Sequence, residues 1–207
     1  MARPVIYVLA GVNGAGKSSI GGYQLDRAGL SWFNPDTFAR ELMVGTGNDQ
    51  PTANGEGWKE GMRRLDAAIT KAESYAFETT LGGNTVAATL LVATRTHDVL
   101  VWFCGLSSPE QHIARVASRV AAGGHDIPAA KIRERYEASR VNLIGLMPHL
   151  AQLMIYDNSV DVAAGDVCPD LVLVGKVVAG KLEWPSDIET LAKTPEWAKP
   201  LLEAAMA

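Results

Sequence analysis

The residues best suited to chemistry stand in a glycine-rich stretch near the N-terminus, residues 11–18, which reads GVNGAGKS. Its glycines can adopt positive φ and leave backbone N–H groups uncovered, so a loop that leads from them into a helix directs several N–H dipoles at one point. Such a point attracts phosphate, and the spacing fits the pattern G-x-x-x-x-G-K-[ST]. We therefore expect Lys17 to contact the β- and γ-phosphates of a nucleotide and Ser18 to be a ligand of Mg²⁺. The other expected nucleotide contacts are Gly11, Asn13, Gly14, Ala15, Gly16 and Ser19.

Two carboxylates follow later apolar segments and are candidates for the acceptor side of a phosphoryl transfer. Asp36, in the stretch NPDTF, could take a proton from an attacking hydroxyl, or it could only complement the dipole of the helix that begins there. Glu78, in the stretch FETT, is either a metal-associated or substrate-binding carboxylate or an exposed glutamate at the end of a strand. The paired glycines that follow would let a ligand approach closely, so we assign Glu78 and Thr79 to substrate binding.

Arginines gather on two expected helices joined by the stretch GGHDIP. Arg115 and Arg119 are four residues apart and share a helix face, Arg133 and Arg140 share another, and Arg135 points elsewhere. Two helices with a glycine hinge and arginines near the junction describe a closing lid, although a solvated helix face is the alternative. Arginine suits this role because its planar fork stabilises charge on a transferring phosphoryl group.

A few polar residues elsewhere are weaker candidates. His125, next to the hinge, receives no catalytic role, because the chain has only four scattered histidines. In the stretch YDNS, Asp157 and Ser159 are expected to make a turn. Asn158 is expected to meet the nucleotide.

Strand-like and helix-like segments alternate along the chain and must position these residues. An apolar strand at 4–10 before the loop and a helix at 17–28 after it favour phosphate binding over a glycine-rich turn with an exposed lysine. Further strands are expected at 31–33, 74–79, 98–106 and 153–159, and further helices at 34–44, 57–72, 84–96, 109–122 and from 128, disturbed near 148. Residues 45–55 are expected to be a flexible loop, and residues 169–184 a hairpin that turns at 179–180 before a helical tail. The pattern predicts an α/β fold with a mostly parallel sheet covered by helices on both faces, which binds ligands at the carboxyl ends of its strands.

Composition narrows the class of protein. The chain has 207 residues, 47% hydrophobic and 20% charged, as in ordinary globular proteins, and we expect a single domain over 1–207. A formal net charge of −4 gives no broad basic footprint, which argues against nucleic acid as the main partner. No apolar run approaches the roughly 18 residues of a membrane span and no secretion signal stands out, so we expect no membrane partner and a cytoplasmic location. Cys104 and Cys168 match no metal-binding spacing, and Cys104 is expected in the core.

The stretches GVNGAGKSS, FNPDTFAR, FETTLGG, RVASRVAAGGHDIPAAKIRERYEASRVNL and YDNS together resemble the zeta toxin family of P-loop kinases, in particular its small stand-alone members. The NPD and GGHDIP segments point to this family. The resemblance implies a kinase-type P-loop NTPase fold with a lid over about 110–142, beyond which a C-terminal hairpin and helical tail follow over about 169–207. It also implies Mg·ATP as phosphate donor and a sugar hydroxyl as acceptor, which for the family's toxins belongs to UDP-N-acetylglucosamine.

Residue by residue, the resemblance implies that Lys17 is the phosphate-loop lysine and Asp36 the base toward the substrate hydroxyl. It implies that Glu78 lies on the substrate side, and Arg119 and Arg133 match best the two arginines that contact the transferring phosphate.

The sequence also departs from the family pattern, in ways that keep the acceptor and the partners open. ETTL replaces the glycine and threonine that usually follow the strand-end glutamate, and the acceptor pocket should draw on residues 45–60 and 78–90, which do not align with the family. The first strand begins at Pro4, so an antitoxin is expected to be a separate protein. The alternatives are a kinase for a nucleoside, an antibiotic or another metabolite, and an ATP-binding switch or ATPase that acts through a protein partner.

Overall fold

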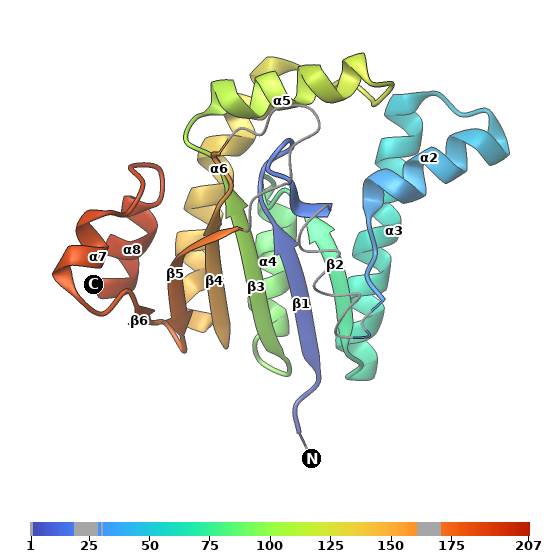
Figure 1. The fold of residues 1–207 in the computed structure, drawn as a ribbon. Coiled ribbons are helices and arrows are strands. Elements are labelled where there is room, and N and C mark those ends of the chain that lie inside the picture. The colour runs from blue at the N-terminus through green and yellow to red at the C-terminus, as the bar shows by residue number, and fades with distance from the viewer. Residues whose placement is uncertain (1, 19–28, 30, 161–170) are drawn as a thin grey trace.

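The computed structural model describes residues 2–18, 29, 31–160 and 171–207. Their strands form one six-stranded sheet in the order β2-β1-β3-β4-β5-β6 (Figure 1). The first four strands of that order pair in parallel, and β5 and β6 are added antiparallel at one side. The strand bounds are β1 Val5–Ala10, β2 Tyr75–Thr79, β3 Asp98–Gly105, β4 Gln152–Asp157, β5 Val172–Val178 and β6 Lys181–Trp184.

Helices surround this sheet. In Figure 1, α4 and α6 lie along one face, α5 crosses above the carboxyl ends of the strands, and α2 and α3 stand beside β2. The expected α/β fold with a mostly parallel sheet flanked by helices is confirmed. Of the helix expected at 17–28, Lys17 and Ser18 are helical and the rest lies outside the described residues. The helix bounds are α2 Pro35–Thr46, α3 Gln50–Lys71, α4 Asn84–Ala93, α5 Pro109–Ala121, α6 Ala129–Leu146, α7 Ile188–Ala192 and α8 Lys199–Met206, with a 3₁₀ turn at Met147–His149.

The central strands are buried because they are apolar on both faces. Ile6 on β1, Val99 on β3 and Leu153 on β4 are completely buried in the main core. Cys104 is buried as expected, and burial raises the pKa of its thiol to about 12. Among the described helices, none is long and apolar enough to cross a membrane.

The prediction of a strand at 31–33 was wrong in its length. Of these three residues, only Phe33 pairs with the sheet, through a parallel bridge to Phe77 on β2. Its backbone N–H donates to the Ala76 carbonyl at 2.9 Å, and its own carbonyl accepts from the Glu78 N–H at 2.9 Å. The next residue already caps α2, so the chain leaves the sheet edge after one pairing.

The flexible loop expected at 45–55 was also wrong. Helix α2 continues to Thr46, Gly47 ends it in the left-handed conformation with φ 73°, and α3 begins at Gln50 rather than Gly57. The Asp49 side chain caps α3 by accepting from the Thr52 N–H at 2.9 Å. Gly45, Gly55 and the proline of this segment are thus helical, and Gly57 is used for close packing.

Gly57 lets the start of α2 approach α3 closely. A Cβ atom at Gly57 would lie 2.7 Å from the carbonyl oxygen of Pro35, whereas a Cβ at Gly55 would meet nothing within 4 Å. We expect Gly57→Ala to lower the free energy of unfolding by about 1–3 kcal/mol. Gly55→Ala should raise it by roughly 0.5–1 kcal/mol, because alanine favours the helix. Urea unfolding of both variants checks this pair, and similar values would contradict the close approach.

The C-terminal part packs against the end of β3. The hairpin turns at Ala179 and Gly180 as expected, with φ of 48° and 78°. Further on, the ring of Trp197 occupies the space that a Cβ at Gly105 would need, 2.3 Å from the nearest ring atom. The Trp197 indole N–H donates to the Asp157 carboxylate at 2.9 Å. The tail is therefore anchored at the end of the sheet where the phosphate-binding loop lies.

Candidate active site

The loop after β1 has the backbone that its glycines predict. Gly11, Gly14 and Gly16 have φ of 140°, 85° and 85°, a region that favours glycine. A Cβ at Gly11 would lie 2.2 Å from the Cys104 carbonyl oxygen, and one at Gly14 would lie 2.8 Å from the His112 carbonyl oxygen. The loop is thus pressed against the end of β3 and against α5, and its conformation depends on glycine.

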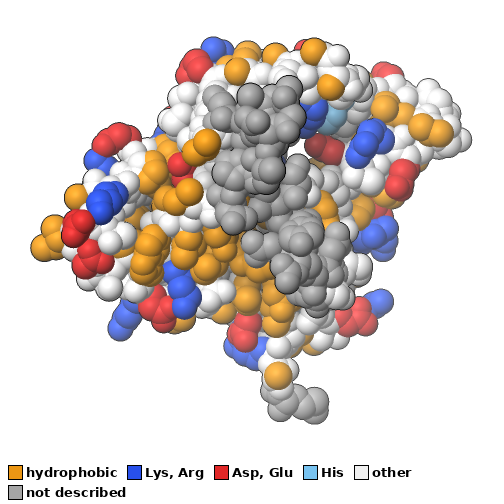
Figure 2. Space-filling model, viewed as in Figure 1, with side chains coloured by type: hydrophobic (Ala, Val, Ile, Leu, Met, Phe, Trp, Pro, Cys, Tyr) orange, Lys and Arg blue, Asp and Glu red, His pale blue; other side chains and the backbone are white. Residues whose placement is uncertain are grey.

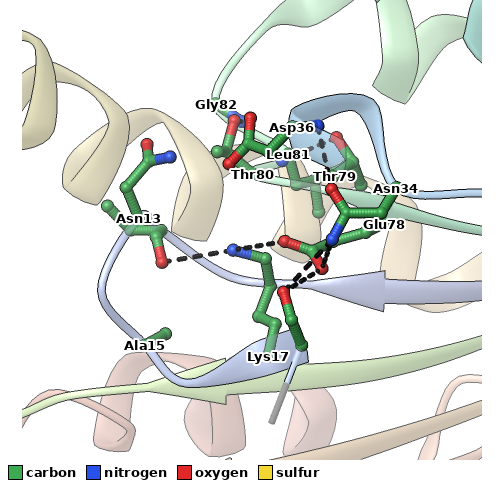
Figure 3. Close-up of polar contacts among 12 residues, drawn as sticks. Asn13, Ala15, Lys17, Asn34, Asp36, Glu78, Thr79, Thr80, Leu81 and Gly82 are labelled. Carbon is green, nitrogen blue, oxygen red and sulfur yellow. Dashed lines mark hydrogen bonds and ion pairs between the residues drawn. The ribbon is translucent and has the colours of Figure 1, made fainter. Parts of the chain in front are cut away.

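Lys17 and Ser18, directly after the loop, both contact Glu78 at the end of β2. The Lys17 Nζ atom lies 3.3 Å from Glu78 Oε1, and both side chains are more than nine-tenths buried. The Ser18 hydroxyl donates to Glu78 Oε2 at 2.7 Å. Figure 3 shows the Glu78 carboxylate lying between Lys17 and Asn34. The parallel pairing of β1 with β2 brings these groups together, because both strands end at the same edge of the sheet.

Asn34 joins this cluster to helix α2. Its Nδ2 group donates to Glu78 Oε2 at 3.1 Å and lies 3.3 Å from Ser18 Oγ. Its Oδ1 atom accepts from the backbone N–H groups of Asp36 and Thr37 at 2.8 and 3.3 Å, which caps the helix. The sequence indicated the cap but not the contacts of the amide nitrogen.

Asp36 lines a cavity of about 270 Å³ at the carboxyl ends of the strands, which we call the acceptor-side cavity. Asn13, Glu78, Thr79, Thr80 and Trp58 share this cavity, as do His125, Asp126, Lys131 and Arg135 from the hinge and α6. Figure 2 shows basic, acidic and histidine side chains meeting in the hollow between α5 and the α2–α3 pair. The expected substrate residues Asp36, Glu78 and Thr79 are thus brought together.

The arginines of α5 and α6 are arranged differently from the expectation. Arg135, expected to point elsewhere, lines the acceptor-side cavity and donates from Nη1 to Asn13 Oδ1 at 2.7 Å. Arg133 lies on the exposed surface, where it pairs with Glu110 at 3.1 Å. Arg119 donates to the His125 carbonyl oxygen at 3.2 Å and so braces the hinge. Burial lowers the pKa of Arg135, and the nearby charge of Asp36 partly opposes this shift.

Asn158 contacts the phosphate-binding loop itself. Its Nδ2 group donates to the Ala15 carbonyl oxygen at 2.9 Å, and its backbone N–H donates to the Gly105 carbonyl oxygen at 3.0 Å. This places Asn158 beside the expected nucleotide site, where it supports the loop. Arg115 donates to the Val160 carbonyl oxygen at 2.9 Å, away from the acceptor-side cavity. Ser19 lies outside the described residues.

His112 is a supporting residue that the sequence did not reveal. It is 1% exposed, and its Nδ1–H donates to the Asn13 carbonyl oxygen at 2.9 Å. Its ring meets that of Tyr136 edge-on at 5.7 Å between centroids. A signal existed in the spacing, because His112 lies four residues before the buried Val116 on α5.

The buried position of His112 predicts a pH dependence of stability. Desolvation lowers the pKa of His112 from 6.5 to about 4, so the unfolded chain binds a proton that the folded chain does not bind at intermediate pH. The free energy of unfolding should therefore fall as the pH falls from about 6.5 to about 4, by up to about 3 kcal/mol from this group. Urea unfolding across this range checks the prediction. His112→Gln should flatten the slope and His149→Gln, at an exposed position, should not.

The oxygen atoms next to the loop fit the expected Mg²⁺. Magnesium is usually held by one or two carboxylates, hydroxyls and waters together with the phosphates of a nucleotide. Ser18 Oγ and the Glu78 carboxylate are such groups, 2.7 Å apart. Within the described residues, no cluster of three or more His, Cys, Asp or Glu side chains forms a metal site of its own. Ser18 and Glu78 therefore suit a metal that arrives with a nucleotide.

Comparison with known proteins places this site in a known fold. No protein-family model and no curated protein matches the sequence. Among solved structures, a chain of the AvrRxo1-ORF1:-ORF2 complex with ATP matches with TM-score 0.67 and 16% identity, covering 99% of this chain and 64% of that one. A chain of the PezAT chromosomal toxin–antitoxin system of Streptococcus pneumoniae matches with TM-score 0.57 and 17% identity, covering 98% of this chain and 88% of that one.

A third match is a chain of the Pnkp1/Rnl/Hen1 RNA repair complex, with TM-score 0.51 and 20% identity over 69% of this chain and 46% of that one. The present chain spans only 64% of the length of the AvrRxo1 chain. At these identities the likeness concerns the fold. The fold expected from the resemblance to zeta toxins is confirmed, since the chain shares it with the PezAT and AvrRxo1 structures.

Proposed function

We propose that this protein is an ATP-dependent phosphotransferase of the zeta toxin type, which transfers the γ-phosphoryl group to an alcohol hydroxyl. The observation that carries the proposal is the position of Asp36. It lines the same cavity as Glu78, whose carboxylate contacts Lys17 and Ser18 of the phosphate-binding loop. A kinase needs such an arrangement, with an acceptor-side carboxylate facing a phosphate-binding loop across a cavity that holds the acceptor.

In this proposal the loop N–H groups and Lys17 hold the β- and γ-phosphates. Asp36 accepts the proton of the acceptor hydroxyl while the hydroxyl oxygen bonds to the γ-phosphorus. The bond from the γ-phosphorus to the bridging oxygen breaks, and ADP leaves with its electron pair. The cationic side chain best placed to stabilise the charge is Arg135, which lines the cavity with Asp36, whereas the positions of Arg119 and Arg133 suit bracing of the lid. Ser18, with Glu78 beside it, would hold a Mg²⁺ ion, which supplies positive charge next to the phosphates when bound.

For the acceptor we propose a nucleotide sugar such as UDP-N-acetylglucosamine. The resemblance to zeta toxins suggests it, and the lining of the cavity suits it. The ring of Trp58, 49% exposed, offers an apolar face to a sugar or a base. Thr80 and Asn54 offer hydrogen bonds, and Lys131 offers a positive charge to a diphosphate.

The test is mass spectrometry of a panel of nucleotide sugars, nucleosides and aminoglycosides incubated with the protein, Mg²⁺ and ATP. A mass gain of one phosphate on a nucleotide sugar supports the full proposal. Gain only on another alcohol keeps the reaction and overturns the nucleotide sugar. ATP hydrolysis without any phosphorylated acceptor favours the alternative of an ATPase or switch.

For a protein partner we propose a separate antitoxin, because the PezAT structure belongs to a toxin–antitoxin system and the AvrRxo1 structure contains ORF1 together with ORF2. Expression in a bacterial host tests the toxic activity on which this depends. The wild-type protein should arrest growth, and a variant without Asp36 should not. Equal growth of both strains would remove the reason to expect an antitoxin.

A further inference from the structure

Asn34 is the side chain that connects the two halves of the candidate site. Its Oδ1 atom accepts hydrogen bonds from the N–H groups of Asp36 and Thr37 in the first turn of α2, that of Asp36 at 2.8 Å. The other end, Nδ2, holds Glu78 Oε2 at 3.1 Å and lies 3.3 Å from Ser18 Oγ. Figure 3 shows this side chain between the Glu78 carboxylate and the start of the helix that carries Asp36.

A cap alone would not require this position. Asp49 also caps its helix, α3, since its carboxylate accepts from the Thr52 N–H at 2.9 Å, and within the described part of the chain it does so without a buried partner for a second donor. Asn and Asp cap helices about equally well, so capping does not explain why an amide stands at Asn34. The amide supplies an N–H donor, and Glu78 is the buried carboxylate that needs one.

Binding of a nucleotide must change the partners of Glu78. In the structure, Glu78 accepts from Ser18 and Asn34 and pairs with Lys17. When Lys17 turns to phosphates and Ser18 to a metal held beside Glu78, Asn34 is the described side chain that still donates a hydrogen bond to Glu78. The hydrogen bond from Asn34 Nδ2 to Glu78 then matters more for Glu78, while Asn34 Oδ1 still accepts from the Asp36 N–H at the start of α2.

We propose that Asn34 is a positioning residue, which couples occupation of the phosphate-binding loop to the orientation of Asp36. The coupling runs from Ser18 and Glu78 through the two ends of one amide to the first turn of α2. This inference rests on the proposed function for its catalytic meaning. The structural coupling itself can be tested without any acceptor.

The first test is hydrogen exchange of the backbone amides at the start of α2, with and without Mg·ATP. In the wild-type protein, Mg·ATP should slow exchange at Asp36 and Thr37. In Asn34→Ser, which keeps a capping oxygen but has no amide nitrogen, this difference should be lost while exchange without nucleotide stays similar. Asp49→Ser is the matched control at the other cap and should keep the wild-type response. A response that persists in Asn34→Ser, or is missing in the wild type, overturns the proposal.

The second test is a double-mutant cycle on the rate of transfer to the acceptor. Asn34→Ser should lower kcat by roughly 100-fold, because the Asp36 carboxylate is displaced from the acceptor hydroxyl. The KM for ATP should change little. In an Asp36→Asn background the same substitution should have little further effect, because Asn34 acts through Asp36. Additive losses would overturn the positioning role. Asn34→Asp keeps the shape of the cap and places a carboxylate against Glu78, so it should be at least as slow.

The two tests separate the possible failures. If no acceptor in the panel is phosphorylated, the proposed function fails, and the exchange experiment still decides whether Asn34 couples the loop to α2. If an acceptor is phosphorylated and the exchange difference survives in Asn34→Ser, the proposed function stands and the inference fails. Thermal unfolding of each variant shows that the protein is folded in both tests.

Discussion

Asp36→Asn is expected to lower the rate of phosphoryl transfer by roughly 10²–10⁴-fold, because asparagine has the shape of aspartate but cannot accept the hydroxyl proton. The backbone N–H of residue 36 would still be held by Asn34, so the start of α2 should keep its place. The affinity for ATP should change little, since Asp36 lines the acceptor side of the cavity. The transfer rate is measured as steady-state ADP formation with an acceptor that the wild-type protein phosphorylates. The affinity for ATP is measured by calorimetry.

The control for Asp36→Asn is the same substitution at Asp66. Asp66 is exposed on α3, and Asp66→Asn should retain the wild-type rate. A fall of less than threefold in Asp36→Asn would show that the hydroxyl loses its proton to another group. The two carboxylates to examine next would then be Glu78 and Asp126, which line the same cavity.

The second large effect is expected at Lys17. The Lys17 ammonium is buried 3.3 Å from Glu78. Lys17→Met would therefore remove the proposed phosphate contact and leave a buried carboxylate without its cation. Transfer should fall by at least about 10³-fold, as for an electrostatic group aimed at the transferring phosphate. The free energy of unfolding should fall by about 3 kcal/mol, the lower end for breaking a buried pair, because Ser18 and Asn34 still donate to Glu78.

The double variant Lys17→Met/Glu78→Gln separates the two effects of Lys17. It removes the unpaired charge, so stability should return toward the wild-type value while transfer stays absent. Denaturant unfolding and the transfer assay measure these in the same preparations. If the double variant is less stable than Lys17→Met alone, the pairing across the two strands is not what Lys17 contributes to the fold.

The sequence predicted well where local chemistry decides the structure. The glycines at 11, 14 and 16 have the positive φ that a phosphate-binding loop requires, and the four parallel strands lie at the expected places. The cap at Asn34 was also predicted, since asparagine followed by proline is a local signal for the start of a helix. Parallel strand ends then brought the loop and Glu78 to one edge, as the topology predicted.

Long-range packing explains the errors. Residues 45–55 contain glycine, asparagine and proline, which locally favour a loop, yet most of them are helical. Ala53, within this segment, is completely buried, so packing of the first turns of α3 outweighs that local preference. Local propensity therefore gave the wrong state for this segment.

The choice among the lid arginines depended on how α6 docks. The sequence assigned Arg133 to the site and directed Arg135 elsewhere, and only the packing of α6 decides between them. Ile132 and Tyr136 face the core, and Arg135 is three residues after Ile132, at the margin of the buried stripe. That margin borders the acceptor-side cavity, whereas Arg133 faces Glu110 on the surface.

The two edges of the sheet also limit how another protein can bind. At one edge, β2 already gives backbone hydrogen bonds to Phe33, and at the other, β6 is only four residues long, presents Lys181 and Glu183 to solvent and runs into Pro185. Short, charged edges that end at proline discourage the addition of a further strand. An antitoxin or a second copy would therefore have to recognise side chains, not extend the sheet.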